Sequence, residues 1–168
     1  IGADAGIRID TEAQDGYQVA QEIAHIAKEG EYDLVIAGRE SIDYNGGMVP
    51  GMLAKMLGYG FINKCVQLDI KDDVATATRE MDGGKEKLSV KLPLVIGGQK
   101  GLVEESDLKI PNMRGIMMAR KKPLHVKEPQ GLQFKTEAQK FEKPAPKGEV
   151  KMVNAENLDE LIDLLHNE

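Results

Sequence analysis

The order of apolar patterns in the first part of the chain limits the fold more than any other feature of the sequence. A short alternating segment, GIRID at residues 6–10, precedes apolar positions at helical spacing that run from Tyr17 to a capping Gly30. The continuous apolar run YDLVIAG, residues 32–38, then predicts a strand buried on both faces of a parallel sheet. Strand, helix and strand in this order indicate a βαβ unit with a right-handed crossover, and therefore an α/β protein.

Residues after this unit predict a second helix followed by an antiparallel addition to the sheet. An apolar helical face at residues 49–57 ends at Gly58. The segments FINKCVQLDI, VATATREM and EKLSVKL are typical of strands, and Asp82-Gly83-Gly84 is a hairpin turn signal between the last two. LPLVIGG, residues 92–98, then returns to the pattern of a buried strand.

Regular pattern fades after Gly101 and revives only at the end of the chain. A helix-like run covers residues 113–120, and EKPAPKGEV is a Pro- and charge-rich spacer. The final segment predicts an amphipathic helix, with Asn154 as N-cap and with Leu158, Leu161, Ile162 and Leu165 on one face. We expect an α/β nucleotide-binding domain at residues 1–125 and, at residues 126–168, an extended arm whose helix is held by another subunit.

Composition excludes several classes of function. The 168 residues are 41% hydrophobic and 30% charged, as in soluble globular proteins, and the net charge of −6 argues against nucleic acid as a partner. Cys65 is the only cysteine, which excludes an intrachain disulfide and favours a reducing, cytoplasmic location. No apolar run approaches the roughly 18–20 residues of a membrane span. The chain begins at Ile1 in what reads as the end of a helix, so we expect an N-terminal piece to be missing.

The glycine-rich stretch AGRESIDYNGGMVPGMLA, residues 37–54, is the strongest candidate site. A strand that leads through such a turn into a helix leaves backbone N–H groups unpaired at the start of the helix, where they suit an anion. We expect a phosphate at the N–H groups of Gly47, Met48 and Val49, beyond the strand that ends at Gly38. A flexible connection remains the alternative interpretation, because the stretch matches neither the Rossmann fingerprint nor the P-loop.

Other polar residues give weaker indications. His25 lies on a mainly apolar helix and favours packing or a surface role, while Asp43 suits either a ribose hydroxyl or a turn cap. The basic cluster Arg120, Lys121 and Lys122 is either a solvated run or a site that steers an acidic partner or pairs with a cofactor phosphate. Spacing supplies no paired base and nucleophile and no set of metal ligands, so we expect neither a catalytic residue nor a metal site.

The hairpin region and three further motifs resemble one family. The hairpin motif comprises Ala77, Arg79, Asp82, Gly83, Gly84, Glu86, Leu88 and the strand PLVI from Pro93. AGRESID is similar to the nucleotide loop of that family, IMMARKKP to its basic segment, and VKMVNAENLDELIDLL to its C-terminal helix. Through these motifs the chain resembles the β subunit of electron transfer flavoproteins over essentially its whole length.

The resemblance implies a parallel-sheet, Rossmann-like sandwich of the adenine nucleotide alpha hydrolase-like kind. It also implies a heterodimer with an α subunit that holds most of an FAD. Such a heterodimer carries electrons from flavin dehydrogenases, such as acyl-CoA dehydrogenases, to a membrane quinone oxidoreductase or another acceptor. In the family the β subunit does no bond-making chemistry. It carries a structural AMP or, in electron-bifurcating members, a second FAD.

The resemblance also assigns roles to particular residues. The nucleotide-binding set is Gly38, Arg39, Ser41, Asp43, Gly46, Gly47, Met48 and Val49. Family members that bind AMP commonly have Asn, Gln and Thr where this chain has Gly47, Met48 and Val49, so phosphate contacts here rest on the backbone. Leu102 matches the solvent-facing leucine of the family's recognition loop, which inserts into a pocket of the dehydrogenase, and the basic cluster supports the same docking.

A second class of function has the same sheet. A nucleotide-binding module of the universal-stress type would use the glycine-rich stretch without any redox role. The hairpin motif and the long C-terminal arm favour the electron transfer flavoprotein, and copurification with a larger flavin-carrying subunit distinguishes the two classes.

Overall fold

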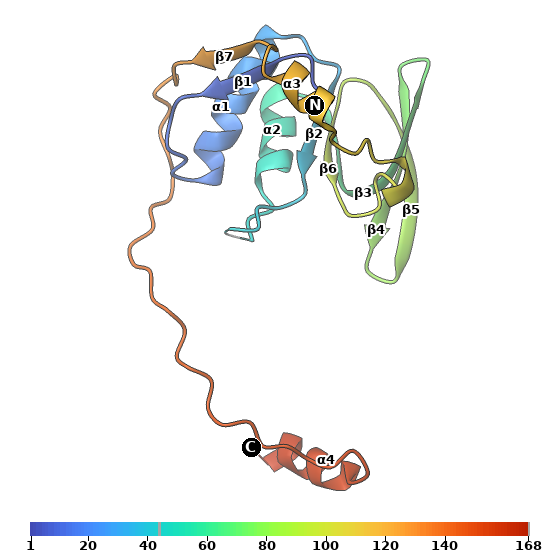
Figure 1. Cartoon of the computed structure of the whole chain (residues 1–168), viewed down its shortest axis with the longest axis vertical. Helices are drawn as coiled ribbons and strands as arrows, with labels where there is room; N and C mark the ends of the chain where they lie inside the picture. Colours follow the sequence, from blue (N-terminus) through green and yellow to red (C-terminus); the bar gives the residue numbers. More distant parts are fainter. Residues whose placement is uncertain (44, 168) are drawn as a thin grey trace. The chain divides into compact units, whose positions relative to one another are not determined.

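The computed structural model describes residues 1–43 and 45–167 of the chain and divides them into two compact units, residues 1–137 and residues 138–168 (Figure 1). The first unit contains three α-helices, a short 3-10 helix and seven strands, and the second contains one helix. The strands are β1 (Gly6–Ile9), β2 (Leu34–Gly38), β3 (Gly60–Lys71), β4 (Val74–Met81), β5 (Gly84–Lys91), β6 (Leu94–Gly98) and β7 (Leu124–Lys127). The helices are α1 (Gly16–Glu29), α2 (Val49–Leu57), α3 (Met113–Ala119) and α4 (Leu158–Asn167), with the 3-10 turn η1 at Glu105–Asp107.

The main sheet has five strands in the order β2-β6-β3-β4-β5. Strands β2, β6 and β3 run parallel, and β3, β4 and β5 form an antiparallel meander, so the expected hairpin addition is confirmed. Its turns use residues with positive φ, namely Asp72 at 49°, Asp73 at 61° and Gly83 at 92°. Short turns of this hand match the twist of the strands that they join.

Strand β6 carries core packing on both of its faces. Val95 packs with Ala24, Leu53 and Ala54 of the helices α1 and α2. Leu94 and Ile96 point to the other face and pack with residues of β3 and β4. Because successive side chains of a strand alternate between faces, one apolar run builds both clusters.

The structure corrects one expectation about the first βαβ unit. Strand β1 pairs in parallel with β7, which the sequence did not indicate, and β2 pairs with β6 instead of β1. The prediction that residues 32–38 form a strand buried on both faces is wrong for part of the run. Strand β2 lies at the edge of its sheet among the described residues, and the side chain of Ile36 is 59% exposed.

Most of the expected helix boundaries are confirmed. Asp15 caps α1, since its carboxylate accepts the N–H of Gln18 at 2.7 Å, and Gly30 ends the helix. Gly58 ends α2 in the left-handed conformation, with φ of 74°. Asn154 does not cap α4. It closes a turn ahead of the helix by accepting the N–H groups of Glu156 and Asn157, and α4 begins at Leu158.

Residues 127–136, which we call the strap, run along α1 in the opposite direction to the helix. The Lys127 ammonium contacts Glu29 at 3.2 Å, the N–H of Gln130 contacts Glu22 at 3.0 Å, and the N–H of Thr136 contacts Asp15 at 2.8 Å. The ammonium group of Lys135 also lies 5.5 Å from the centre of the Tyr17 ring. The compact unit therefore extends to Glu137, beyond the expected domain boundary at residue 125.

We expect the end of the strap to detach in acid. The N–H of Gln18, followed by the N–H groups of Lys135 and Thr136, holds the pKa of Asp15 below its ordinary value of 3.8, although partial desolvation opposes them. A depressed pKa in the folded state means that this stabilisation is present above the ordinary pKa and is lost as the pH falls through the folded-state pKa. The amide NMR shifts of Lys135 and Thr136 should therefore hold steady from neutral pH to about pH 5 and move at lower pH. Their titration should be absent in Asp15→Asn.

Candidate functional site

The candidate site is the loop that joins the carboxyl end of β2 to α2, which we call the cradle (residues 38–49). Gly38 pairs with Gly98 of β6, and the N–H of Arg39 extends the ladder by donating to the Gly98 carbonyl at 3.1 Å. Beyond Arg39 the loop doubles back, because the N–H of Ser41 donates to the Gly46 carbonyl at 2.9 Å. These bonds bring Gly46 and Gly47 back toward the end of the strand.

The start of α2 offers free backbone donors to the cradle. Met48 precedes the helix without a side-chain cap bond, and Pro50 in the first turn has no N–H. No residue in the described part of the chain accepts a backbone hydrogen bond from the N–H of Gly47 or Met48. Since the first N–H groups of a helix have no partner within it, this end of α2 can receive an anion.

Two polar residues of the predicted nucleotide set lie at the exposed tip of the cradle. The side chain of Ser41 is exposed, and within the described ranges no group donates a hydrogen bond to the carboxylate of Asp43. Asp43 therefore makes no turn-capping bond with any described residue.

The cradle packs directly on the first turn of α1. A Cβ atom added to Gly16 would lie 2.9 Å from Met48 Cγ and 3.3 Å from Val49 Cγ2. A Cβ atom added to Gly47 would lie 3.4 Å from the Arg39 carbonyl oxygen. Gly16 thus lies against the side chains of Met48 and Val49, and Gly47 lies against the backbone of Arg39.

A polar cavity of about 390 Å³ lies next to the cradle, beyond the ends of β2, β6 and β4. Its charged and amide side chains come from six positions: Arg39, Lys64, Glu80, Asp82, Lys85 and Gln99. The guanidinium of Arg39 is paired with Glu40 at 2.6 Å, and the amide group of Gln99 donates to Glu80. Arg39 therefore lines this cavity, whereas Ser41 and Asp43 lie at the exposed tip of the cradle.

Sequence reasoning missed two residues near this cavity. The side-chain oxygens of Asn63 and Gln99 are buried, and no described group donates a hydrogen bond to them. The oxygen of Asn63 lies over Gly97, where a Cβ atom would be only 2.1 Å away. Neither residue stands in a recognisable motif, so only the spatial arrangement could have identified them.

The docking residues are placed differently from the expectation. Leu102 is half-buried, packs against the core cluster around Ile96, and lies against Gly98, so the prediction of a solvent-facing leucine is wrong. The reason is a tight turn, in which the N–H of Leu102 donates to the Gln99 carbonyl and folds the side chain back onto the sheet. The exposed apolar residues of the same loop are Val103, Leu108 and Ile110, and Ile110 is 82% exposed.

The three residues of the basic cluster after α3 differ in their contacts. The Lys122 ammonium is engaged by the backbone carbonyls of Ile1 and Ala3. Arg120 and Lys121 remain exposed at the end of the helix. Only these two keep their charge available to a partner.

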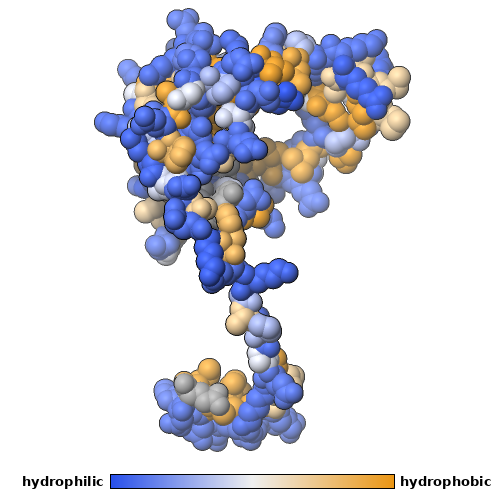
Figure 2. Space-filling view, turned by 90° about the vertical axis from the view of Figure 1, so that its left-hand side faces the viewer, coloured by the Kyte–Doolittle hydropathy of each residue, from blue (hydrophilic) through white to orange (hydrophobic). Residues whose placement is uncertain are grey.

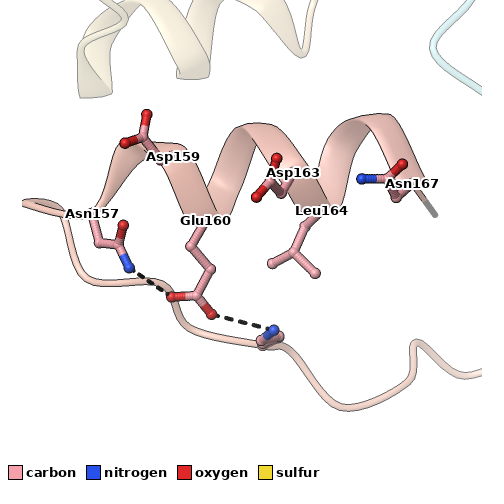
Figure 3. Close-up of a pocket in the computed structure, with 7 residues that line it drawn as sticks. Asn157, Asp159, Glu160, Asp163, Leu164 and Asn167 are labelled. Atoms are coloured by element: carbon pink, nitrogen blue, oxygen red, sulfur yellow. Dashed lines mark hydrogen bonds and ion pairs between the residues drawn. The ribbon is translucent and has the colours of Figure 1, made fainter.

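The C-terminal unit presents two contrasting faces. Its hollow, between α4 and the preceding segment, is lined by polar side chains including Asp159, Glu160 and Asp163, and Glu160 binds Lys151 at 3.3 Å (Figure 3). The predicted apolar face is present and uncovered within this unit: its four large side chains, at Leu158, Leu161, Ile162 and Leu165, are 42 to 76% exposed. In Figure 2 apolar atoms of this unit are bordered by hydrophilic ones.

Comparison with known proteins identifies the family. The electron transfer flavoprotein domain matches residues 1–130 of the chain. The electron transfer flavoprotein subunit beta of Bacillus subtilis is 35% identical over 128 residues, which are 74% of this chain and 49% of that protein. The subunit of Dictyostelium discoideum is 33% identical over 96% of this chain and 66% of its own length. That of Arabidopsis thaliana, a mitochondrial protein, is 33% identical over 100% of this chain and 68% of its own length.

The chain therefore belongs to the electron transfer flavoprotein family, as a protein of the β-subunit type. This confirms the resemblance that the hairpin motif indicated. The chain spans about half to two thirds of the length of these relatives. None of the helices that the structure describes combines the length and apolar character that a membrane crossing requires. Its described residues also contain no cluster of His, Cys, Asp or Glu suited to a metal ion.

We expect Leu102→Ala to lower the free energy of unfolding by about 1–3 kcal/mol, because it removes a half-buried side chain from the core cluster. Ile110→Ala, in the same loop, should change it by less than about 0.5 kcal/mol, since that side chain is exposed. Urea unfolding followed by circular dichroism measures both. Equal stability of the two variants would contradict the packed position of Leu102.

Proposed function

We propose that this chain is the non-catalytic electron-carrier subunit of a heterodimeric flavoprotein, and that it binds AMP as a structural group in the cradle. The observation that carries the proposal is that the N–H groups of Gly47 and Met48 have no backbone acceptor among the described residues, in the loop that the family match covers. A phosphate there would receive hydrogen bonds from Gly47, Met48 and Val49 and the favourable end of the α2 dipole. AMP supplies no redox chemistry, so its role is to fix the loop between β2 and α2.

A second FAD in place of AMP is the alternative. What favours it is the polar cavity beside Arg39, which offers room next to the cradle for more than a mononucleotide. Denaturing the purified subunit and separating the released compound decides between them, because flavin absorbs visible light and AMP does not. Release of neither compound by a subunit of full length would oppose both.

The redox partner chemistry is proposed to lie outside this chain. FAD, held mainly by an α subunit, would accept electrons from dehydrogenases such as acyl-CoA dehydrogenases and pass them to a quinone oxidoreductase. The loop with Val103, Leu108 and Ile110 is exposed and apolar, as a small docking anchor requires, and Arg120 and Lys121 can steer an acidic patch. This chain contributes docking and positioning.

We expect Gly47→Val to release the nucleotide. The new side chain would crowd the Arg39 carbonyl, already 3.4 Å from a Cβ atom at this position, and would fill the space of the phosphate. Overpacking of about 1–3 kcal/mol corresponds to roughly a 5- to 150-fold loss of affinity. Nucleotide content per subunit after gel filtration measures the effect. Gly148→Val, in the C-terminal unit and with open space around it, is the matched control and should keep its nucleotide.

The apolar face of α4 is expected to bind the α subunit. Leu161→Glu places a charge on the exposed apolar face and should weaken the heterodimer by at least about tenfold, since burying an unpaired charge is costly. Asp159→Asn, on the polar side that lines the hollow, is the control and should leave the affinity within about threefold. Titration of one subunit into the other by calorimetry tests this. Equal affinity of Leu161→Glu and wild type would assign the face to another partner.

A further inference from the structure

Three carboxylates hold the strap to α1 at regular intervals. Asp15, Glu22 and Glu29 stand about two helical turns apart and therefore form a single stripe along the helix. Each holds a different point of the strap, and the order of these points runs from Lys127 at Glu29 to Thr136 at Asp15. At Glu22 and Asp15 the donors are backbone N–H groups, so attachment there depends little on the strap's side chains.

The two oxygens of Asp15 have separate tasks. Oδ1 accepts the N–H of Gln18 at 2.7 Å and so caps α1. Oδ2 accepts the N–H of Thr136 at 2.8 Å, the N–H of Lys135 at 2.5 Å and the hydroxyl of Thr136 at 3.3 Å. One side chain thus joins the first turn of α1 to the end of the strap.

That same turn supports the cradle. Gly16, the residue after Asp15, packs so closely on Met48 and Val49 that even a Cβ atom there would be 2.9 Å from Met48 Cγ. Met48 and Val49 carry N–H groups to which the proposed function assigns the phosphate. A change in the first turn of α1 therefore reaches these two residues through their side chains.

We propose that Asp15 couples attachment of the strap to nucleotide binding in the cradle. The inference rests on the proposed function, because it requires a nucleotide phosphate at Met48 and Val49. With the strap attached, Asp15 is fixed from both sides, and the first turn of α1 holds Met48 in place. With the strap detached, Asp15 keeps only its hydrogen bond to Gln18. The entropy cost of ordering the cradle then falls on phosphate binding and lowers the affinity.

The coupling extends to whatever binds the C-terminal unit. The strap ends at Thr136, and the chain continues through Glu137 into residues 138–168. A subunit that binds the apolar face of α4 therefore acts on the chain that Asp15 holds. Coupling of this kind is reciprocal, so nucleotide in the cradle also favours the attached strap.

Two variants detach the strap from opposite sides. Asp15→Asn keeps one oxygen for the cap of α1, but it presents an NH₂ group where Oδ2 accepts three hydrogen bonds. Thr136→Pro removes an N–H and the hydroxyl from the strap and leaves α1 unchanged. Glu29→Gln is the matched control, because it makes the same kind of change at the far end of the stripe, where the contacts affected are exposed ones with Lys127 and His25.

The experiment measures AMP affinity by calorimetry, together with amide hydrogen exchange of Lys135 and Thr136, on the complete subunit. We expect faster exchange of Lys135 in both Asp15→Asn and Thr136→Pro, and of Thr136 in Asp15→Asn, since proline has no amide hydrogen. Both variants should lose AMP affinity by roughly fivefold or more, with Glu29→Gln unchanged. We also expect AMP to slow exchange of Thr136 in the wild type. Wild-type AMP affinity in variants whose strap exchanges freely would overturn the coupling alone. A wild-type subunit that binds neither AMP nor FAD would overturn the proposed function and the coupling with it.

Discussion

The pairing of β6 with β2 and β3 is the constraint on which the rest of the domain depends. β6 supplies Val95 to the helices and Leu94 and Ile96 to the opposite cluster, so its displacement would open both halves of the core. Its parallel register with β2 also brings Gly38 and Gly98 to the same edge of the sheet. The cradle, the polar cavity and the turn that buries Leu102 all begin at that edge, which is where parallel sheets bind their ligands.

Much of this arrangement could be predicted from the sequence, because it depends on local pattern. Helical spacing ending at Gly30 and Gly58, the hairpin glycine at residue 83 and the apolar strands were each sufficient to locate their elements. The partners of the strands were harder to predict. Nothing in GIRID indicates that β1 pairs with β7, since pairing depends on contacts between residues far apart in the chain.

The candidate site also has features that the local sequence predicts and features that depend on tertiary contacts. The glycine-rich loop was predictable because backbone donors at a helix start follow from the order of strand, turn and helix. The buried oxygens of Asn63 and Gln99, and the contact of Gly16 with Met48, depend on how three strands and two helices come together. The prediction for Leu102 was wrong for a related reason. A leucine in a loop is expected to be exposed, whereas here a single turn folds the side chain onto the core.

The outer edge of β2 has a consequence for the behaviour of the chain in solution. Among the described residues β2 pairs on one side only and leaves Ile36 exposed, and an edge of this kind is a template that another extended segment can join without rearranging the sheet. The described residues carry no proline or charged side chain within β2 itself, the features that usually prevent such pairing. Self-association through this edge should therefore grow with protein concentration wherever no other segment covers it.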